Sequence, residues 1–310
     1  MRLTGLHLLL TYQCTFECDH CFVWGSPRQE GTMTLKTIRH VLKQAREMGT
    51  VEWIYFEGGE PLLFHPILVR GVEEARKEGF RVGLVSNAYW ATSQEDAEIW
   101  LAPFAGAVSD LSLSSDLYHA SDRISQQVRD ARAAAEKLGI PVDVVSIAEP
   151  EAGARSCTGQ LPHGESAVMF RGRAAEALAS RAPHRPWAEF GECPHEDLQD
   201  PGRLHVDPLG FAHVCQGVSL GNTLGESLSE ICGRYDPSSH PICGPLLEGG
   251  PAELARRYGL RPSEAYADAC HLCDESRRRL RSRFPEVLTP DQMYGELAGA
   301  NGGGEPPMVG

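Results

Sequence analysis

Long apolar runs are missing from this 310-residue chain, and so is an excess of positive charge. No stretch approaches the roughly 20 apolar residues that span a bilayer, which argues against a transmembrane helix. The 29 Lys and Arg side chains face 42 Asp and Glu, for a formal net charge of −13. Phosphate backbones and anionic lipid surfaces repel such a chain, so we expect no nucleic-acid partner and no membrane partner.

We also expect no cleavable signal sequence. The first ten residues are apolar, but they lack a small-residue cleavage site and run straight into a group of cysteines. We interpret them as a buried strand and expect the protein to be cytoplasmic. In that reducing compartment, cysteines bind metals or do chemistry rather than form disulfides. A secreted disulfide scaffold is therefore excluded, and the ten cysteines become the feature to explain.

Short apolar segments alternate with helical patterns in the first half of the chain. This alternation predicts βα units and a parallel sheet. Six strands are too few for the usual eight-stranded barrel of ~250 residues, so we expect an open or partial barrel. The expected strands are 6–11, 51–56, 81–86, 107–114, 142–148 and 167–170. The expected helices are 35–48, 66–78, 93–101 and 121–138, the last capped by Ser121.

The second half has a different texture, rich in Pro, Gly and Cys, with short apolar pieces at 204–206 and 211–214. Such a segment predicts a small domain whose core is supplemented by bound metal. We therefore expect a barrel domain over 1–182 and a cysteine-rich domain over 183–290. The Gly- and Pro-rich stretch 291–310 is expected to be a mostly disordered tail.

Three cysteines lie close together after the first expected strand, at Cys14, Cys18 and Cys21. Three thiolates on one loop can converge on one metal centre, and a four-iron cluster held by only three would keep one iron open to an exogenous ligand. A zinc site with His20 as fourth ligand, or three buried thiols, would use the same residues. The spacing and the position favour the iron–sulfur cluster.

A second motif, Gly58-Gly59-Glu60-Pro61, follows the second expected strand. Together the two motifs resemble the signature of the radical S-adenosylmethionine (SAM) enzymes, over about residues 4–182. The resemblance implies a partial (β/α)6 TIM-like barrel, a [4Fe-4S] cluster on the three cysteines, SAM on its open iron, and an external electron donor such as flavodoxin or ferredoxin. It also implies reductive cleavage of SAM to a 5′-deoxyadenosyl radical that abstracts hydrogen from substrate.

The resemblance further implies SAM contacts at the strand ends. The glycines permit close backbone approach, and the Glu60 carboxylate can accept from the SAM ammonium. Ser112 and Ser114 share one strand face, of which we favour Ser114. The candidate SAM-binding residues are Gly58, Gly59, Glu60, Ser86, Asn87, Ser112, Ser114 and Arg123. No residue is assigned a catalytic role beyond the cluster ligands.

Six further cysteines lie beyond the barrel, and their spacing resembles the SPASM/twitch auxiliary domain of many radical SAM enzymes. Because no cysteine follows Cys273, we expect the shorter twitch form with one auxiliary [4Fe-4S] cluster. Its expected ligands are Cys193, Cys215, Cys270 and Cys273. A structural zinc ion would fit the same four ligands. Cys232 or Cys243 could replace one of them, and Cys157 could touch substrate; otherwise all three are ordinary buried thiols.

Two segments of the second half remain. The segment 170–174, Phe-Arg-Gly-Arg-Ala, resembles a Gly-Arg-Ala turn between barrel and auxiliary domain. The basic run 277–283 is expected to be a solvated helix face, with recognition of an acidic peptide as the alternative.

The resemblance constrains the substrate only weakly. We expect modification of a ribosomally made peptide (RiPP-type), with a small-molecule substrate in cofactor or natural-product biosynthesis as the alternative. A non-catalytic iron–sulfur or zinc-binding protein is a third interpretation, disfavoured by the intact motifs. Because the first motif begins at Cys14, we expect no leader-binding module before it, so a peptide would dock directly or through a separate recognition protein.

Overall fold

The computed structural model describes residues 1–152, 161 and 163–296. Its first half alternates strands and helices, which confirms the expected α/β architecture. The strands are β1 (Gly5–Thr11), β2 (Trp53–Gly58), β3 (Arg81–Ser86), β4 (Asp110–Ser114) and β5 (Val142–Val145). The helices between them are α1 (Leu35–Met48), α2 (His65–Lys77), α3 (Gln94–Leu101) and α4 (Gln126–Lys137). Helix α1 and strand β3 have the bounds predicted from the sequence.

Local sequence signals explain why these elements begin and end where they do. The Thr34 side chain accepts a hydrogen bond from the Thr37 backbone N–H and so caps α1. Gly49, with φ of 68°, ends the helix in the left-handed conformation that glycine adopts without strain. Helix α4 starts later than expected because Ser125, rather than Ser121, supplies its cap.

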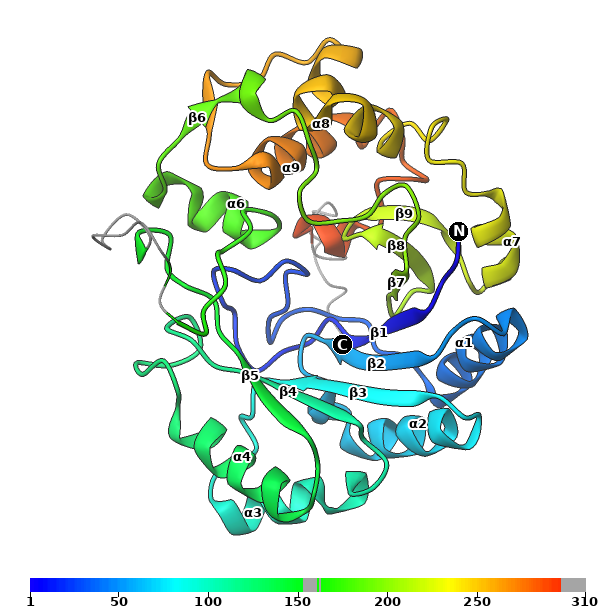
Figure 1. Cartoon of the computed structure of the whole chain (residues 1–310), viewed down its shortest axis with the longest axis vertical. Coiled ribbons are helices and arrows are strands. Elements are labelled where there is room, and N and C mark those ends of the chain that lie inside the picture. The colour runs from blue at the N-terminus through cyan, green and yellow to red at the C-terminus, as the bar shows by residue number, and fades with distance from the viewer. Residues whose placement is uncertain (153–160, 162, 297–310) are drawn as a thin grey trace, which may run out of the picture.

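The second half adds three strands to the same sheet, β7 (Arg203–Val206), β8 (Phe211–Cys215) and β9 (Val218–Asn222). Its strands β6 (Arg185–Pro186) and β10 (Ala265–Tyr266) form a separate antiparallel pair. Its helices are α6 (Arg173–Ala177), α7 (Leu228–Arg234), α8 (Cys243–Arg257, kinked at Gly249 and Gly250) and α9 (Ala269–Leu280). Figure 1 shows α1 and α2 beside β1–β3, while α8 and α9 lie at the opposite end of the molecule.

The eight-stranded sheet has the order β5-β4-β3-β2-β1-β7-β8-β9. Strands β1 to β5 are parallel, and β7 joins the free edge of β1 in parallel before β8 and β9 turn antiparallel. The sixth expected strand, 167–170, is wrong, since the described chain has there only an isolated bridge between Ile147 and Ser166. The sixth parallel strand comes instead from β7, whose Leu204 and Val206 are fully buried.

The expected tail is ordered over its first residues. Residues 291–296 fold back onto the body, and the buried Tyr294 hydroxyl donates to the Gly217 carbonyl at 2.8 Å. The remainder of that tail, 297–310, lies outside the described residues, as does Cys157. In the part of the chain that is described, helices long and apolar enough to cross a membrane are absent.

Candidate active site

The carboxyl ends of β1 to β4 meet at one edge of the sheet, where a cavity of about 330 Å³ opens. Parallel strands bring the loops that follow them to the same edge, so distant motifs become neighbours. Eight of the residues predicted from the sequence line this cavity: Cys14, Cys18, Cys21, Gly58, Gly59, Ser86, Asn87 and Ser114. Three others, Glu60, Ser112 and Arg123, are not among the lining residues.

Two hydrogen-bond donors point at sulfur atoms of the loop that carries Cys14, Cys18 and Cys21, which we call the cysteine loop. The backbone N–H of Gly25 donates to Cys21 Sγ at 3.2 Å, and Asn87 Nδ2 donates to Cys14 Sγ at 3.5 Å. Burial raises the pKa of the Cys14 thiol to about 11 and that of Cys18 still further. Free thiols therefore keep their protons here, and a bound metal centre is what would hold them as thiolates.

The spread of the sulfur atoms distinguishes two kinds of metal centre. Among the described residues, no three cysteine sulfurs lie within 4.8 Å of one another. Tetrahedral zinc, with Zn–S bonds of about 2.3 Å, would draw its sulfur ligands to roughly 3.8 Å apart. A four-iron cluster keeps its cysteines farther apart, because each cysteine binds a different iron. In any three of these cysteines, at least two sulfur atoms thus lie farther apart than the sulfur ligands of a bound zinc ion.

Gly58, the last residue of β2, and Gly59, directly after it, are needed by the cysteine loop itself. The Gly59 N–H donates to the Thr11 carbonyl at 2.7 Å, and the Glu60 N–H donates to the Gln13 carbonyl at 2.8 Å. A Cβ on Gly59 would lie 2.1 Å from the Gln13 oxygen. These glycines therefore let their own backbone lie against the start of the cysteine loop. This contact fixes the Gly58–Gly59 segment, which we call the Gly58–Gly59 edge, beside the cysteines.

Glu60 lies behind the cavity and not in it. The side chain is fully buried and accepts hydrogen bonds from Leu62 N, Ser86 Oγ and Asn87 N at 2.8–3.0 Å. Burial raises its pKa to about 7 despite these bonds, which act in the opposite direction. In the structure Glu60 positions Ser86 and Asn87, and its contact with the SAM ammonium stays a prediction.

Arg123 lies apart from the other predicted contacts. Its guanidinium pairs with Glu165 Oε1 at 2.9 Å, and its side chain is about half exposed. The late start of α4 leaves 115–125 as a turn that carries Arg123 away from the main cavity. It lines a separate, much smaller cavity beside Asp116 and Ile147.

Sequence reasoning missed one polar group of the cavity wall. His20 and His119 line the cavity, with the buried Asp116 between them, 2.7 Å from His119 Nδ1 and 3.6 Å from His20 Nε2. Burial lowers the pKa of His20 to about 4, so its imidazole is neutral. We expected His119 to be a surface or packing residue and considered His20 only as the fourth ligand of a zinc site. The position of His20 directly before Cys21 was the available signal.

The segment 170–174 holds the cysteine loop from the other side. Arg173 donates from Nη1 to the Cys18 carbonyl at 2.7 Å and from Nη2 to the Gly25 carbonyl at 2.9 Å. Gly172, with φ of 60°, would place a Cβ 2.7 Å from Phe22 Cα. The resemblance marked this turn, but its contact with the loop only emerges from the structure.

The second set of cysteines lines a second, nearly filled cavity. Cys193, Cys215, Cys270 and Cys273 all face it, which brings together the four predicted ligands. Cys243 lines the same space, whereas Cys232 is buried in the core elsewhere. Cys243, and not Cys232, is therefore the one described alternative to the four predicted ligands.

Two buried arginines border this second cavity. Arg171 donates to Glu196 Oε1 at 3.0 Å and to Cys215 Sγ at 3.5 Å, and it lines the first cavity as well. Arg277, expected on a solvated helix face, is instead 3% exposed and donates to the Gln216 carbonyl. Their positive charges would offset those of thiolate ligands in a closed pocket.

Comparison with known proteins agrees with this geometry. Residues 8–146 match the Radical SAM superfamily. This matched stretch contains the cysteine loop and the Gly58–Gly59 edge, and so both motifs lie where the superfamily model matches the chain. The match spans β1 to β5 and leaves the second cysteine cavity outside it.

Curated relatives match over shorter stretches. YydG of Bacillus subtilis (strain 168), named for a proposed role in peptide biosynthesis, is 29% identical over 36% of this chain and 35% of its own length. The PqqA peptide cyclase of Streptomyces rochei is 35% identical over 29% of this chain and 24% of its own. The matches thus span about a quarter to a third of these relatives. The native anSMEcpe structure with bound AdoMet shares the fold over 91% of this chain and 97% of its own, with a TM-score of 0.52 at 12% identity.

Proposed function

We propose that this chain is a radical SAM enzyme whose Cys14, Cys18 and Cys21 hold a [4Fe-4S] cluster with SAM on its open iron. The observation that carries the proposal is their convergence, with the Gly58–Gly59 edge, on one cavity at the strand ends. When bound, cluster and SAM supply one-electron cleavage of the sulfonium and a 5′-deoxyadenosyl radical.

The chain's own residues would bind and orient the cluster and SAM and shield them from water. Asn87 and the Gly25 N–H donate to the ligand sulfurs, and Glu60 fixes the Ser86–Asn87 turn against the loop. Much of the remaining wall is apolar, which keeps water away from a reactive intermediate. Its apolar side chains include Leu9, Val23, Val85, Val145, Val168 and Met169.

A second, auxiliary [4Fe-4S] cluster in a twitch-type domain is part of the proposal. Its support is the common cavity that Cys193, Cys215, Cys270 and Cys273 line. Arg171 lines both cavities and so stands between the two centres. A closed four-cysteine cluster there suits electron transfer or a structural role.

For the substrate class we propose a peptide. Two relatives with sequence similarity in the barrel region are named for peptide biosynthesis and peptide cyclisation, which supports this class. A small-molecule substrate is the competing possibility that the experiments below separate.

Cleavage of SAM tests the enzymatic part of the proposal. Anaerobically reconstituted protein, given SAM and dithionite, is expected to release 5′-deoxyadenosine, measured by liquid chromatography. Cys18→Ala should abolish the release, while Cys232→Ala, at a buried cysteine outside both cavities, should retain it. A fully reconstituted wild-type protein that releases none would overturn the assignment.

The peptide proposal has its own test. The chain is co-expressed with each short open reading frame found beside its gene, and the peptides are analysed by mass spectrometry. We expect one peptide to change mass with the wild-type enzyme and to stay unchanged with Cys18→Ala. Active SAM cleavage without any modified peptide, together with a changed small metabolite, would refute the peptide class but not the radical chemistry.

A further inference from the structure

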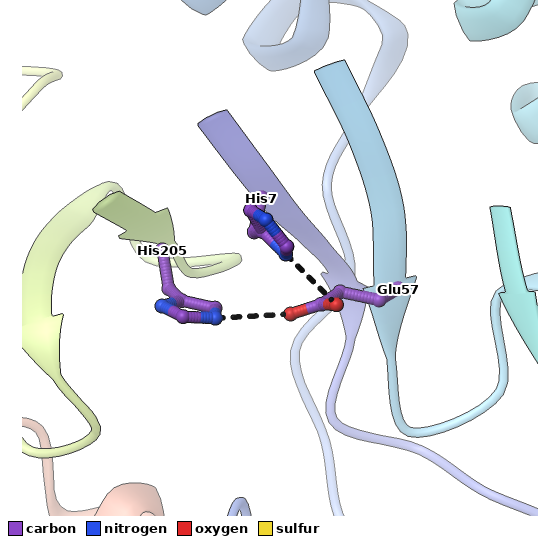
Figure 2. A group of neighbouring side chains, drawn as sticks. All are labelled: His7, Glu57 and His205. Atoms are coloured by element: carbon purple, nitrogen blue, oxygen red, sulfur yellow. Dashed lines mark hydrogen bonds and ion pairs between the residues drawn. The ribbon is translucent and has the colours of Figure 1, made fainter. Parts of the chain in front are cut away.

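A group of two histidines and one glutamate lies inside the barrel, apart from both sets of cysteines. His7 on β1, Glu57 at the end of β2 and His205 on β7 point toward one another (Figure 2). His7 Nδ1 lies 3.1 Å from Glu57 Oε2, and His205 Nε2 lies 3.3 Å from Glu57 Oε1. One ligand atom from each residue falls within 4.8 Å of the other two.

The sheet fixes these positions firmly. His7 and His205 are direct partners across the parallel β1–β7 pair, and Glu57 follows two residues after Tyr55, the β2 partner of His7. The Tyr55 ring stacks on the His7 ring at 4.7 Å, which restricts the imidazole orientation. Ligands on rigid neighbouring strands pay little ordering entropy when they bind an ion.

Polar atoms in this group lack hydrogen-bond partners. The His205 side chain is only 7% exposed, yet its Nδ1 has no hydrogen bond among the described residues. Glu57 Oε1 is likewise buried without a hydrogen bond, its nearest contact being His205 Nε2. Buried polar atoms are normally satisfied. The unbonded Glu57 Oε1, which lies beside His205 Nε2, is therefore the atom of this group that indicates an absent ligand between the side chains.

The local charges are compatible with a bound cation. Arg171 and Arg203 lie nearby, but both are engaged with Glu196, at 3.0 and 3.2 Å. The histidines hold the pKa of Glu57 below its usual range, and burial lowers the pKa of His205 to about 3. The group therefore presents one carboxylate and a neutral imidazole with a free lone pair, as metal ligation requires.

We propose that His7, Glu57 and His205 form a binding site for a divalent transition-metal ion. Two imidazoles and one carboxylate are the donor set of open mononuclear sites for zinc, iron(II) or manganese. Three protein ligands leave coordination positions free. Glu57 also lines the cavity that holds the cysteine loop, so the ion lies in its wall and can bind a carboxylate or carbonyl oxygen of the substrate.

Manganese(II) is the probe of choice, because it prefers imidazole and carboxylate to thiolate and leaves the cysteines alone. The full chain is first reconstituted with iron and sulfide, then titrated anaerobically with Mn²⁺ while electron paramagnetic resonance counts the free ion. Wild-type protein is expected to bind one Mn²⁺ per chain and to release it when Zn²⁺ is added, since zinc binds such ligands more tightly. SAM and turnover are not needed, so the outcome is independent of the proposed enzymatic function.

Variants decide which residues bind the ion. Glu57→Gln and His205→Asn are each expected to weaken Mn²⁺ binding at least tenfold, while the exposed matched controls Glu73→Gln and His163→Asn bind as wild type does. Glu57→Gln is nearly isosteric and serves even where a histidine variant fails to fold. Its iron content checks that the variant folds and takes up its clusters.

Absence of binding by the wild type, or equal binding by Glu57→Gln and Glu73→Gln, would overturn the site and leave a hydrogen-bonded network. Loss of binding only in His20→Asn would overturn it in favour of the His20–Asp116–His119 group.

Discussion

Arg173 donates a hydrogen bond to the Cys18 carbonyl at 2.7 Å, across 155 residues of sequence. The same guanidinium donates to the Gly25 carbonyl, so one buried side chain closes the cysteine loop from both ends. We predict that Arg173→Ala loosens the loop and speeds loss of the first cluster at least tenfold, since a hydrogen bond from a charged donor contributes about 1.5–3 kcal/mol. Iron release into a chelator, followed by absorbance, measures the rate.

Two further variants make that experiment specific. Arg173→Lys can keep one of the two bonds and should fall between wild type and Arg173→Ala. Arg70→Ala removes an exposed arginine of α2 and should leave the rate unchanged. Equal rates for all of the variants would show that Arg173 does not hold the loop.

Gly59 is predicted to tolerate no side chain. Because a Cβ there would lie 2.1 Å from the Gln13 carbonyl oxygen, Gly59→Ala must push the cysteine loop away from β2. We expect a loss of about 3 kcal/mol or more in the free energy of unfolding, together with poor cluster incorporation. Urea denaturation and iron analysis measure the two effects.

Gly233 is the matched control, because a Cβ there meets nothing within 4 Å and the residue lies inside α7. Gly233→Ala should stabilise the protein by about 0.5–1 kcal/mol through the higher helix propensity of alanine. Similar stability losses in the two variants would contradict the steric argument.

Iron stoichiometry tests the auxiliary site. Reconstituted wild-type protein should carry about eight irons per chain, and Cys273→Ser about four, because the second cluster loses a ligand. Cys232→Ser, outside the second cavity, should keep about eight. Cys243→Ser should do the same if the four predicted cysteines suffice. Loss of iron in Cys243→Ser but not in Cys193→Ser would exchange these two residues in the ligand set.

Arg171 should raise the reduction potential of the auxiliary cluster. Its guanidinium donates to Cys215 Sγ, and a positive charge beside a ligand sulfur favours the reduced, more negative state. Arg171→Met is therefore expected to lower the potential, measured by redox titration in a Cys14→Ala/Cys18→Ala/Cys21→Ala background that lacks the first cluster. Arg203→Met removes the other partner of Glu196 without touching a sulfur, and its potential should stay near the reference. A larger shift with Arg203→Met would contradict this role.

Glu60 predicts a pH dependence of stability. Its pKa rises from an ordinary 4.5 to about 7 in the folded chain, so the unfolded state gives up this proton first as the pH increases. The carboxyl thus favours folding at low pH, and its contribution falls by about 3 kcal/mol between pH 4 and pH 8. Glu60→Gln does not titrate. The difference in unfolding free energy between the two proteins should change by that amount across this range, whereas parallel pH profiles would rule out the raised pKa.

Much of the first half could be predicted from the sequence, because its signals are local. The cap at Thr34, the stop at Gly49 and the period of the apolar residues define α1 within a few neighbouring side chains. The cysteine motif is equally local, since three ligands on eight consecutive residues must share one loop wherever that loop lies. The Gly58–Gly59 edge follows a predicted strand, so its place at the same end of the sheet followed from parallel strand order.

Contacts between segments that are distant along the chain could not be predicted from the sequence. The sixth parallel strand was expected at 167–170, but β7 pairs with the free edge of β1 and buries Leu204 and Val206 there. Which segment occupies that edge depends on packing between parts of the chain that are far apart in sequence. Glu60 points behind the cavity, whereas Arg173 points to the cysteine loop. These side-chain directions are set by the strand and turn geometry of the folded chain.

Short motifs and local periodicity were enough to predict the cysteine motif, the parallel α/β architecture and the family resemblance from the sequence. Folding brings Arg171 to both cavities, buries Arg277 and places His7, Glu57 and His205 together, and none of these three contacts could be predicted from local sequence. The physical reason is strand register: a shift by one residue turns a side chain to the opposite face of the sheet. Register is fixed by packing across the whole sheet, and so residues 50 positions apart, such as His7 and Glu57, become neighbours only in the folded chain.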